Sequence, residues 1–371
     1  MPSGALLLHP SSADRTLRLT RRALLGGGAA LVVTAGSARA QGLHDNVHRL
    51  GHALRERVQL TAAMLGIAAP PMHDPALLVA GSADSASGAF ASAIADALGH
   101  ALPAHAPLGV TDTVGQDGVT GANQFDSLTA PDGNTALVAP GTAWLAWLAG
   151  DPRVHFDPSR WMPVAARLGS GALVLRHDTP TPGPDVTIRL AATSPTGAEL
   201  PAWLALSLLG AKVVAVPGLG DDEERRRALI DGRIDAALLL GTDTASTLGS
   251  FAGEAATAAF SLGPERDPAL PALPSFVQYA TNAGRPPSGA LFDAWQAGTA
   301  AARLLSGVML PALAPAAMVA TWRRAARGLP ATPGLLAAPA CLPACQAALG
   351  SEAATFALRR WLADTAGWRP A

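Results

Sequence analysis

The chain has 371 residues, of which 49% are hydrophobic and 15% are charged, and its formal net charge is −1. A sequence of this length and apolar content can bury the core of two ordinary α/β domains or one large domain, and it is not intrinsically disordered. The balanced charge gives no strongly basic face, so nucleic acid is not an expected partner. Two cysteines are too few for a disulfide scaffold or a four-thiolate zinc site.

Residues 1–40 contain the three parts of a cleavable export signal. Arg21 and Arg22 precede a short apolar run that contains glycines, and the segment ends at Ala38-Arg39-Ala40. The paired arginines favour the twin-arginine route, which carries folded proteins. The apolar run is shorter than the roughly 20 residues that a membrane-spanning helix needs. We therefore predict cleavage after about Ala40 and a soluble, periplasmic mature protein.

An N-terminal extension at 41–73 follows the signal, and apolar residues at helical spacing predict an amphipathic helix over 42–66. His44, His48 and His52 fall on one face of this helix, which is compatible with a metal site. Because no further ligand is apparent, a solvated polar stripe is the favoured interpretation. We expect neither a metal nor a cofactor.

A strand, a small-residue loop and a helix follow one another three times after residue 75. The predicted strands are 76–80, 135–139 and 187–191, the helices that follow them are 88–98, a helix around 144–148 and 202–209, and further strands are expected at 173–175, 213–216 and 236–240. Strands that alternate with helices predict an α/β fold with parallel sheets and right-handed crossovers. The proline-rich segment 179–184 predicts a boundary between two such units.

The common enzyme signatures are missing from the sequence. There is no Gly-x-Ser-x-Gly or His-Glu-x-x-His motif, and Lys212, the only lysine, does not follow a phosphate-binding loop. Gly218-Leu219-Gly220 lacks the third glycine of a dinucleotide fingerprint. Cys341 and Cys345 are spaced one residue further apart than a Cys-x-x-Cys pair, so a local disulfide or two unpaired thiols are favoured over redox catalysis. The chain is therefore not expected to be an enzyme.

Polar loops at the carboxyl ends of the predicted strands are the candidate ligand site. Ligands of open α/β sheets bind there because loop amides and helix N-termini point at the same space. Each helix end favours an anion by about 0.3–1 kcal/mol, so several converging ends could hold a carboxylate. The alternative is that these residues only cap helices. The candidate ligand-binding residues are Gly81, Ser82, Ala83, Asp84, Ser85, Gly141, Thr142, Ser194, Thr196 and Gly197.

Several short segments carry a resemblance to a known family through their shared order from about residue 74 to 368. They are the glycine-rich segment 115–121 and the segments 130–135, 163–168, 216–218, 229–236 and 269–276. In this order the chain resembles the extracytoplasmic solute receptors of tripartite tricarboxylate transporters, the Bug or TctC-type family. No single motif is specific, and the exported start of the chain agrees independently.

The resemblance implies a type II periplasmic binding protein with two α/β lobes, parallel-dominated sheets and crossing strands between the lobes. Lobe 1 would comprise residues 74–178 and 301–371, and lobe 2 residues 179–300. The cleft between the lobes would hold a small organic acid or amino acid, such as a dicarboxylate, and pass it to a membrane permease. The protein is expected to act as a monomer without catalysis of its own.

The first loop departs from the family pattern. It reads Gly81-Ser82-Ala83-Asp84-Ser85, where the family has a Pro-Gly-Gly turn whose amides meet the ligand. Asp84 would repel a carboxylate unless it turns away or caps a helix. The helix 42–66 is also an addition to the family pattern. The chain is therefore interpreted as a divergent member, and a periplasmic sensor or scaffold with a degenerate cleft remains the alternative.

Overall fold

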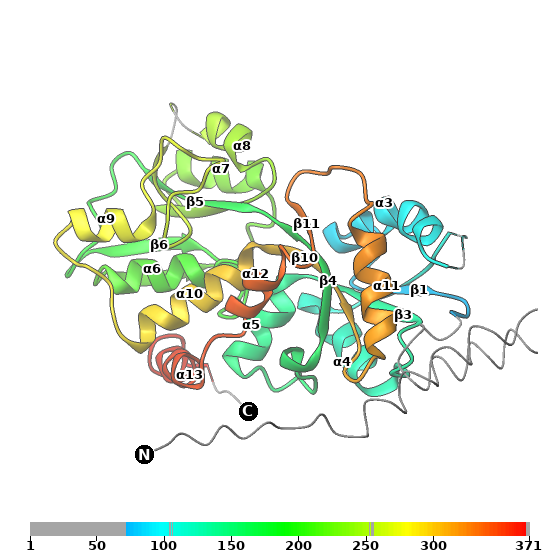
Figure 1. Cartoon of the computed structure of the whole chain (residues 1–371). Helices are drawn as coiled ribbons and strands as arrows, with labels where there is room; N and C mark the ends of the chain where they lie inside the picture. The colour runs from blue at the N-terminus through cyan, green and yellow to red at the C-terminus, as the bar shows by residue number, and fades with distance from the viewer. Residues whose placement is uncertain (1–71, 104, 106, 252, 254–255, 369–371) are drawn as a thin grey trace, which may run out of the picture. The chain divides into compact units, whose positions relative to one another are not determined.

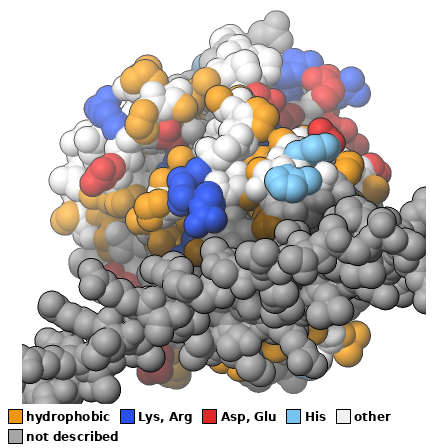
Figure 2. Space-filling model, turned by 45° about the vertical axis from the view of Figure 1, so that its right-hand side comes forward, with side chains coloured by type: hydrophobic (Ala, Val, Ile, Leu, Met, Phe, Trp, Pro, Cys, Tyr) orange, Lys and Arg blue, Asp and Glu red, His pale blue; other side chains and the backbone are white. Residues whose placement is uncertain are grey.

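The computed structural model describes residues 72–368 except 104, 106, 252 and 254–255 (Figure 1). The predicted export signal 1–40, its cleavage site, the helix 42–66 and the three histidines on it lie outside the described residues. Within the described part, no helix combines the length and the apolar character needed to cross a bilayer. Arginines and acidic side chains are interspersed on the described part of the face in Figure 2.

A six-stranded sheet has the order β11-β4-β10-β3-β1-β2. β1 pairs in parallel with β2 and β3, whereas β10 runs antiparallel to β3 and β4. The strands are β1 (Ala76–Ala80), β2 (Gly109–Thr113), β3 (Thr135–Ala139), β4 (Met162–Leu168), β10 (Leu304–Leu310) and β11 (Leu335–Ala337). The helices of this region are α3 (Ala86–Ala101), α4 (Val119–Leu128), α5 (Gly141–Ala149) and α11 (Ala316–Ala326).

The sheet is apolar on both faces because helices cover both. Leu77 and Val79 of β1 share a buried cluster with Phe90 of α3 and Trp322 of α11. The alternate residue Leu78 belongs to a second cluster, which contains residues of α4 and α5. Successive side chains of a strand point to opposite faces, so the unbroken apolar run of β1 serves both cores.

A five-stranded sheet has the order β7-β6-β8-β5-β9. β6 pairs in parallel with β7 and β8, and β5 runs antiparallel to β8 and β9. The strands are β5 (Ser170–Arg176), β6 (Thr187–Ala191), β7 (Lys212–Val216), β8 (Ala236–Gly241) and β9 (Ala256–Ser261). The helices of this region are α6 (Leu200–Leu208), α7 (Asp222–Ile230), α8 (Thr244–Phe251) and α9 (Phe276–Asn282).

The chain crosses between the sheets twice. It leaves β4 for β5 at Gly169 and returns through α10 (Ala290–Arg303) to β10. Gly169 N donates to Arg303 O at 2.8 Å, and Arg303 Nε donates to Gly169 O at 2.9 Å. The two crossings are therefore hydrogen-bonded to each other. The first crossing lies ahead of the predicted boundary at residue 178, and the proline-rich segment 179–184 joins two strands of the same sheet.

The C-terminal residues complete the core beside the crossings. α12 (Leu342–Ala347) and α13 (Glu352–Ala366) contact α10, and α13 also contacts α5. The Trp368 indole donates to Ala149 O at 3.2 Å, and Arg359 Nε donates to Leu148 O at 3.1 Å. These bonds satisfy carbonyl groups at the end of α5 that have no partner within the helix.

The predicted two-lobe α/β fold is confirmed, with sheets that are mixed. The antiparallel pairings involve β4, β5 and β10, which are the strands next to the crossings. β5 and β10 arrive from the other sheet and not from a helix of their own sheet, so they do not share the direction that a βαβ unit imposes, and β4 is antiparallel to its neighbour β10. The sequence analysis also missed β2, whose residues Gly-Val-Thr-Asp-Thr are almost all exposed and carry no apolar run.

Candidate functional site

The loops that follow β1, β2 and β3 meet at one edge of the six-stranded sheet. The three strands are parallel neighbours, so their carboxyl ends lie together. Gly81 N donates to Thr113 O at 3.0 Å, which joins the first loop to the end of β2. A Cβ atom on Gly118 would lie 2.7 Å from Pro140 Cδ, so the loops after β2 and β3 are also in contact. The predicted loops 81–85 and 141–142 therefore share this edge.

The polar groups of the first loop are engaged within the loop. Ser85 caps α3 by accepting a hydrogen bond from Gly88 N at 3.1 Å, and its hydroxyl donates to Ser82 O at 2.6 Å. A hydrogen bond from the Ser82 hydroxyl holds the pKa of the exposed Asp84 below its usual value. Asp84 is thus a carboxylate at neutral pH. Ser85 has the capping role that the sequence analysis gave as the alternative to ligand contact.

Gly141 and Thr142 begin α5 close to the second crossing. A Cβ atom on Gly141 would lie 1.8 Å from Ala301 O and 2.5 Å from Leu304 O, so only glycine fits there. The requirement for glycine comes from this close approach of two backbones. The Thr142 hydroxyl donates to Asp117 O at 3.1 Å, which ties α5 to the loop after β2.

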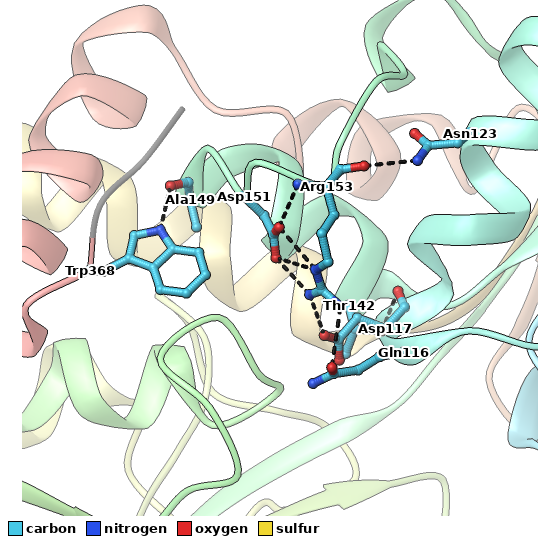
Figure 3. Close-up of polar contacts among 8 residues, drawn as sticks. All are labelled: Gln116, Asp117, Asn123, Thr142, Ala149, Asp151, Arg153 and Trp368. Atoms are coloured by element: carbon cyan, nitrogen blue, oxygen red, sulfur yellow. Dashed lines mark hydrogen bonds and ion pairs between the residues drawn. The ribbon is translucent and has the colours of Figure 1, made fainter.

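A charged cluster that the sequence analysis missed lies beside Thr142 (Figure 3). Arg153, in the loop after α5, pairs with Asp151 at 2.6 Å and with Asp117 at 3.2 Å. Its guanidinium also donates to Gln116 Oε1 at 3.2 Å. The Asn123 side-chain amide fixes the backbone of the same residue by donating to Arg153 O at 2.8 Å. Arg153 therefore joins the loop after α5 to the loop after β2 and to α4.

The two carboxyl groups that share Arg153 have opposite pKa shifts. Burial works to raise the pKa of Asp151, but hydrogen bonds from Arg153 outweigh it and the pKa is lowered. At Asp117, burial outweighs the hydrogen bond and the charge of Arg153, so its pKa is raised. Asp117 also has a φ of 59°, a left-handed conformation that few residues other than glycine adopt. Shifted pKa values and backbone strain both concentrate at functional sites.

The loop between β6 and α6 in lobe 2 contains three of the predicted ligand residues and a buried glutamate. Glu199 is only 5% exposed; it accepts a hydrogen bond from the Thr193 hydroxyl at 3.2 Å and pairs with Arg225 at 3.1 Å. A Cβ atom on Gly197 would lie 2.9 Å from both Thr193 Oγ1 and Glu199 Oε2. The absence of a side chain at Gly197 therefore makes room for this polar group.

Ser194 Oγ in this loop and Arg225 Nε in α7 are buried donors that have no protein partner among the described residues. Leaving a buried polar group unpaired costs about 1–3 kcal/mol, so such a group normally has a ligand or an ordered water. Thr196, a third predicted ligand residue of this loop, is buried.

The acidic groups of the two lobes interact electrostatically. The charge of Glu199, on the lobe 2 loop, is one of the influences that raise the pKa of Asp117 on lobe 1. The loops after β2 and β6 thus lie close enough for their charges to interact. Thr142 is hydrogen-bonded to the backbone of Asp117. Ser194 and Gly197 lie in the same loop as Glu199. Asp117 lies in the glycine-rich segment 115–121, but no sequence motif marked Arg153, Glu199 or Arg225, because their pairing depends on segments that are distant in the sequence.

No protein-family model and no curated protein matches the sequence. Among solved structures, the chain is similar to MatC from Rhodopseudomonas palustris, which was solved with bound malate. The identity is 18%, the TM-score is 0.50, and the match covers 78% of this chain and 98% of that one. It is also similar to a TctC solute-binding protein from Polaromonas without ligand, with 16% identity and a TM-score of 0.52 over 79% of this chain and 96% of that one. At these identities the similarity establishes the fold. The resemblance stated from the sequence is thus confirmed in its architecture: the chain has the two-lobe α/β fold of TctC-type solute-binding proteins.

Proposed function

We propose that this chain is a periplasmic solute-binding receptor that holds a small carboxylate-type metabolite between its two lobes. The predicted export signal would deliver it to the periplasm, where a permease of the tripartite tricarboxylate type would receive the ligand. The protein would act by binding, as a monomer, and without chemistry on the ligand.

The observation that carries this proposal is the shared fold with a protein solved with malate, together with a polar site beyond the carboxyl ends of the parallel strands. Ligands of α/β sheets bind beyond the carboxyl ends of the parallel strands. Here those ends bring Asp117 and Thr142 from lobe 1 toward Glu199 on the lobe 2 loop. Ser194 Oγ and Arg225 Nε supply donors that lack protein partners among the described residues. A ligand carboxylate would satisfy both.

The proposed ligand contacts combine the predicted loops with the charged residues that flank them. Ser82, Ala83 and Asp84 would form the entrance, while Gly141, Thr142, Ser194, Thr196 and Gly197 would line the site. The carboxylate of Asp84 and, when it is ionised, that of Asp117 disfavour a negatively charged ligand group beside them. The carboxylate group of the ligand would therefore be held on the Arg225 and Ser194 side.

A periplasmic sensor or scaffold with a degenerate cleft is the second candidate. It is favoured by the first loop, where the Ser82 and Ser85 side chains bind other groups of the same loop. In such a protein, the acidic side chains of Asp84 and Asp117 would repel anions, and a membrane partner would bind to the surface of the protein.

A thermal-shift screen of mono-, di- and tricarboxylates and amino acids on the purified protein tests the proposal. A ligand at 100 times its dissociation constant adds about 2.7 kcal/mol to the free energy of unfolding. Calorimetry on each hit then compares Ser194→Ala and Arg225→Gln with Ser250→Ala. Ser250 is an exposed serine of α8 whose hydroxyl donates a hydrogen bond to Thr247 O.

Binding of one small acid that is weakened by Ser194→Ala and Arg225→Gln, and unchanged by Ser250→Ala, would support the receptor. A panel without any response would favour the sensor or scaffold. Turnover of a hit during the measurement would contradict both candidates and indicate an enzyme.

A further inference from the structure

Two buried thiols lie one helical turn apart at the start of α12, outside the proposed ligand site. Cys341 is 0% and Cys345 4% exposed, and both are free cysteines. Cys345 N donates to Cys341 O at 3.1 Å, so the backbone between them forms a regular helical turn. The two thiols influence each other: Cys345 lowers the pKa of Cys341, and Cys341 raises that of Cys345. The two side chains are therefore neighbours.

A cavity lies beside the second thiol of this pair. Cys345 lines a pocket of about 370 Å³, whose other walls include Trp161, Leu342 and the thioether side chain of Met309. Met309 is 1% exposed, so the pocket brings thiol and thioether groups into a mainly apolar setting. Such sulfur ligands are soft and select soft cations over hard ones.

The helical geometry favours a bridging cation over a direct disulfide. Residues four apart in an α-helix have Cα atoms about 6.2 Å apart, at the long end of the range that disulfides span. A cation between the sulfur atoms lets them remain further apart than a covalent bond does. The described residues contain no group of three or more His, Cys, Asp or Glu side chains that could hold a metal ion. A zinc ion, which takes four such ligands in structural sites, does not fit this pair.

The charge around the pair also suits a soft monovalent cation. Binding by two thiolates releases both thiol protons and leaves a complex with one net negative charge. The positive charge of Arg323 acts on Cys341. Arg323 itself is fixed beside β4, because its Nε donates to Pro163 O at 2.9 Å. A positive charge is thus already in place to balance the complex.

From this arrangement we propose that Cys341 and Cys345 form a two-thiolate binding site for Cu(I), with Met309 in the wall of the access pocket. The site is separate from the proposed carboxylate site, so it does not depend on the proposed function. It would make the protein a carrier or sensor of a soft metal ion in addition to its binding of a solute.

The test uses Cu(I) itself, offered to the reduced protein without oxygen from a Cu(I)-selective chelator. We expect about one Cu(I) per chain, with Zn(II) not retained in the same assay. Cys341→Ala and Cys345→Ala should each abolish this uptake, whereas Met309→Leu should retain it within about tenfold. Alanine is chosen because buried free cysteine behaves as a small apolar residue, and thermal melts confirm that each variant is folded.

Two outcomes would overturn the proposal. Equal Cu(I) uptake by the double alanine variant would place the metal elsewhere in the chain. The second outcome concerns protein isolated from the periplasm of an expression host, unfolded without reductant and treated with a thiol reagent. If the reagent does not label it, the two cysteines form a disulfide in the periplasm.

Discussion

Each lobe contains an aspartate held by arginine, and the two aspartates behave in opposite ways. Asp235 in lobe 2 binds the Arg189 guanidinium through both oxygens, at 2.7 and 2.8 Å, and also pairs with Arg176 at 3.2 Å. The hydrogen bonds from Arg189, which outweigh burial, lower its pKa to about 2. Asp117 in lobe 1 shares its single arginine with Asp151, and its pKa is raised by burial.

The difference separates a structural ion pair from the candidate functional site. Asp235 pairs with two arginines, which compensate for its burial, and it stabilises the fold by joining β5, β6 and the start of β8. At Asp117 the single shared arginine does not compensate for burial, and the negative charge of Glu199 raises its pKa further. Its backbone also has a left-handed conformation. A group kept in an unfavourable state is one that a ligand can stabilise.

The largest effect that this comparison predicts is on Asp235→Asn. The substitution leaves Arg189 and Arg176 with a weaker partner in a half-buried position, and we expect a loss of about 2–4 kcal/mol in the free energy of unfolding. Urea denaturation measures it. Asp178→Asn is the control, because Asp178 also pairs with Arg176 but its side chain is 85% exposed; a loss below about 0.5 kcal/mol is expected there. Equal losses in both variants would contradict the structural role of Asp235.

Acid should remove the contribution of Asp235 in a defined pH range. Its pKa lies below the usual value of 3.8 when folded, so its stabilisation is complete above about pH 4 and is lost as the pH falls toward 2. Because the arginines are partly exposed to solvent, we expect about 1–2 kcal/mol. Urea midpoints measured from pH 5 to pH 2.5 should fall more steeply in the natural protein than in Asp235→Asn.

Asp117→Asn should have a smaller effect of the opposite sign. The raised pKa means that ionisation of Asp117 weakens the folded state as the pH rises through its folded pKa. Asparagine removes this charge and tolerates the left-handed conformation better than most residues. We expect a gain below about 1 kcal/mol at pH 7 that disappears in acid, measured by thermal unfolding. A large loss of stability at pH 7 would show that the bond to Arg153 dominates.

The smallest predicted effect is on the pKa of Asp117 in Glu199→Gln. Removing the charge of Glu199 should lower the pKa of Asp117 toward its usual value, while glutamine can keep the hydrogen bond from Thr193. Carboxyl-carbon NMR titration reads this pKa directly. Glu223→Gln, on the exposed face of α7, is the control and should leave it unchanged. If Glu199→Gln also leaves the Asp117 pKa unchanged, the loops of the two lobes do not interact as described.

The sequence alone was sufficient to predict the α/β architecture. The apolar runs at 76–80, 135–139 and 187–191 correspond to β1, β3 and β6 at the predicted residues. A buried strand must be apolar on both faces, and the helix after it begins where polar or small residues appear, so local composition determines both elements. The order of weak motifs then predicted the same fold that the solved structures share.

The tertiary structure alone decided which residues form the candidate site. Asp117 and Arg153 come from the loops after β2 and α5, Glu199 comes from the loop before α6 and Arg225 from α7, and nothing near them in the sequence marks their partners. Their hydrogen bonds and ion pairs depend on distances between these elements, which the chain sets only when both crossings at Gly169 and Arg303 are in place. Burial and charge act through space, so the sequence predicted where the loops lie and folding determined what they can bind.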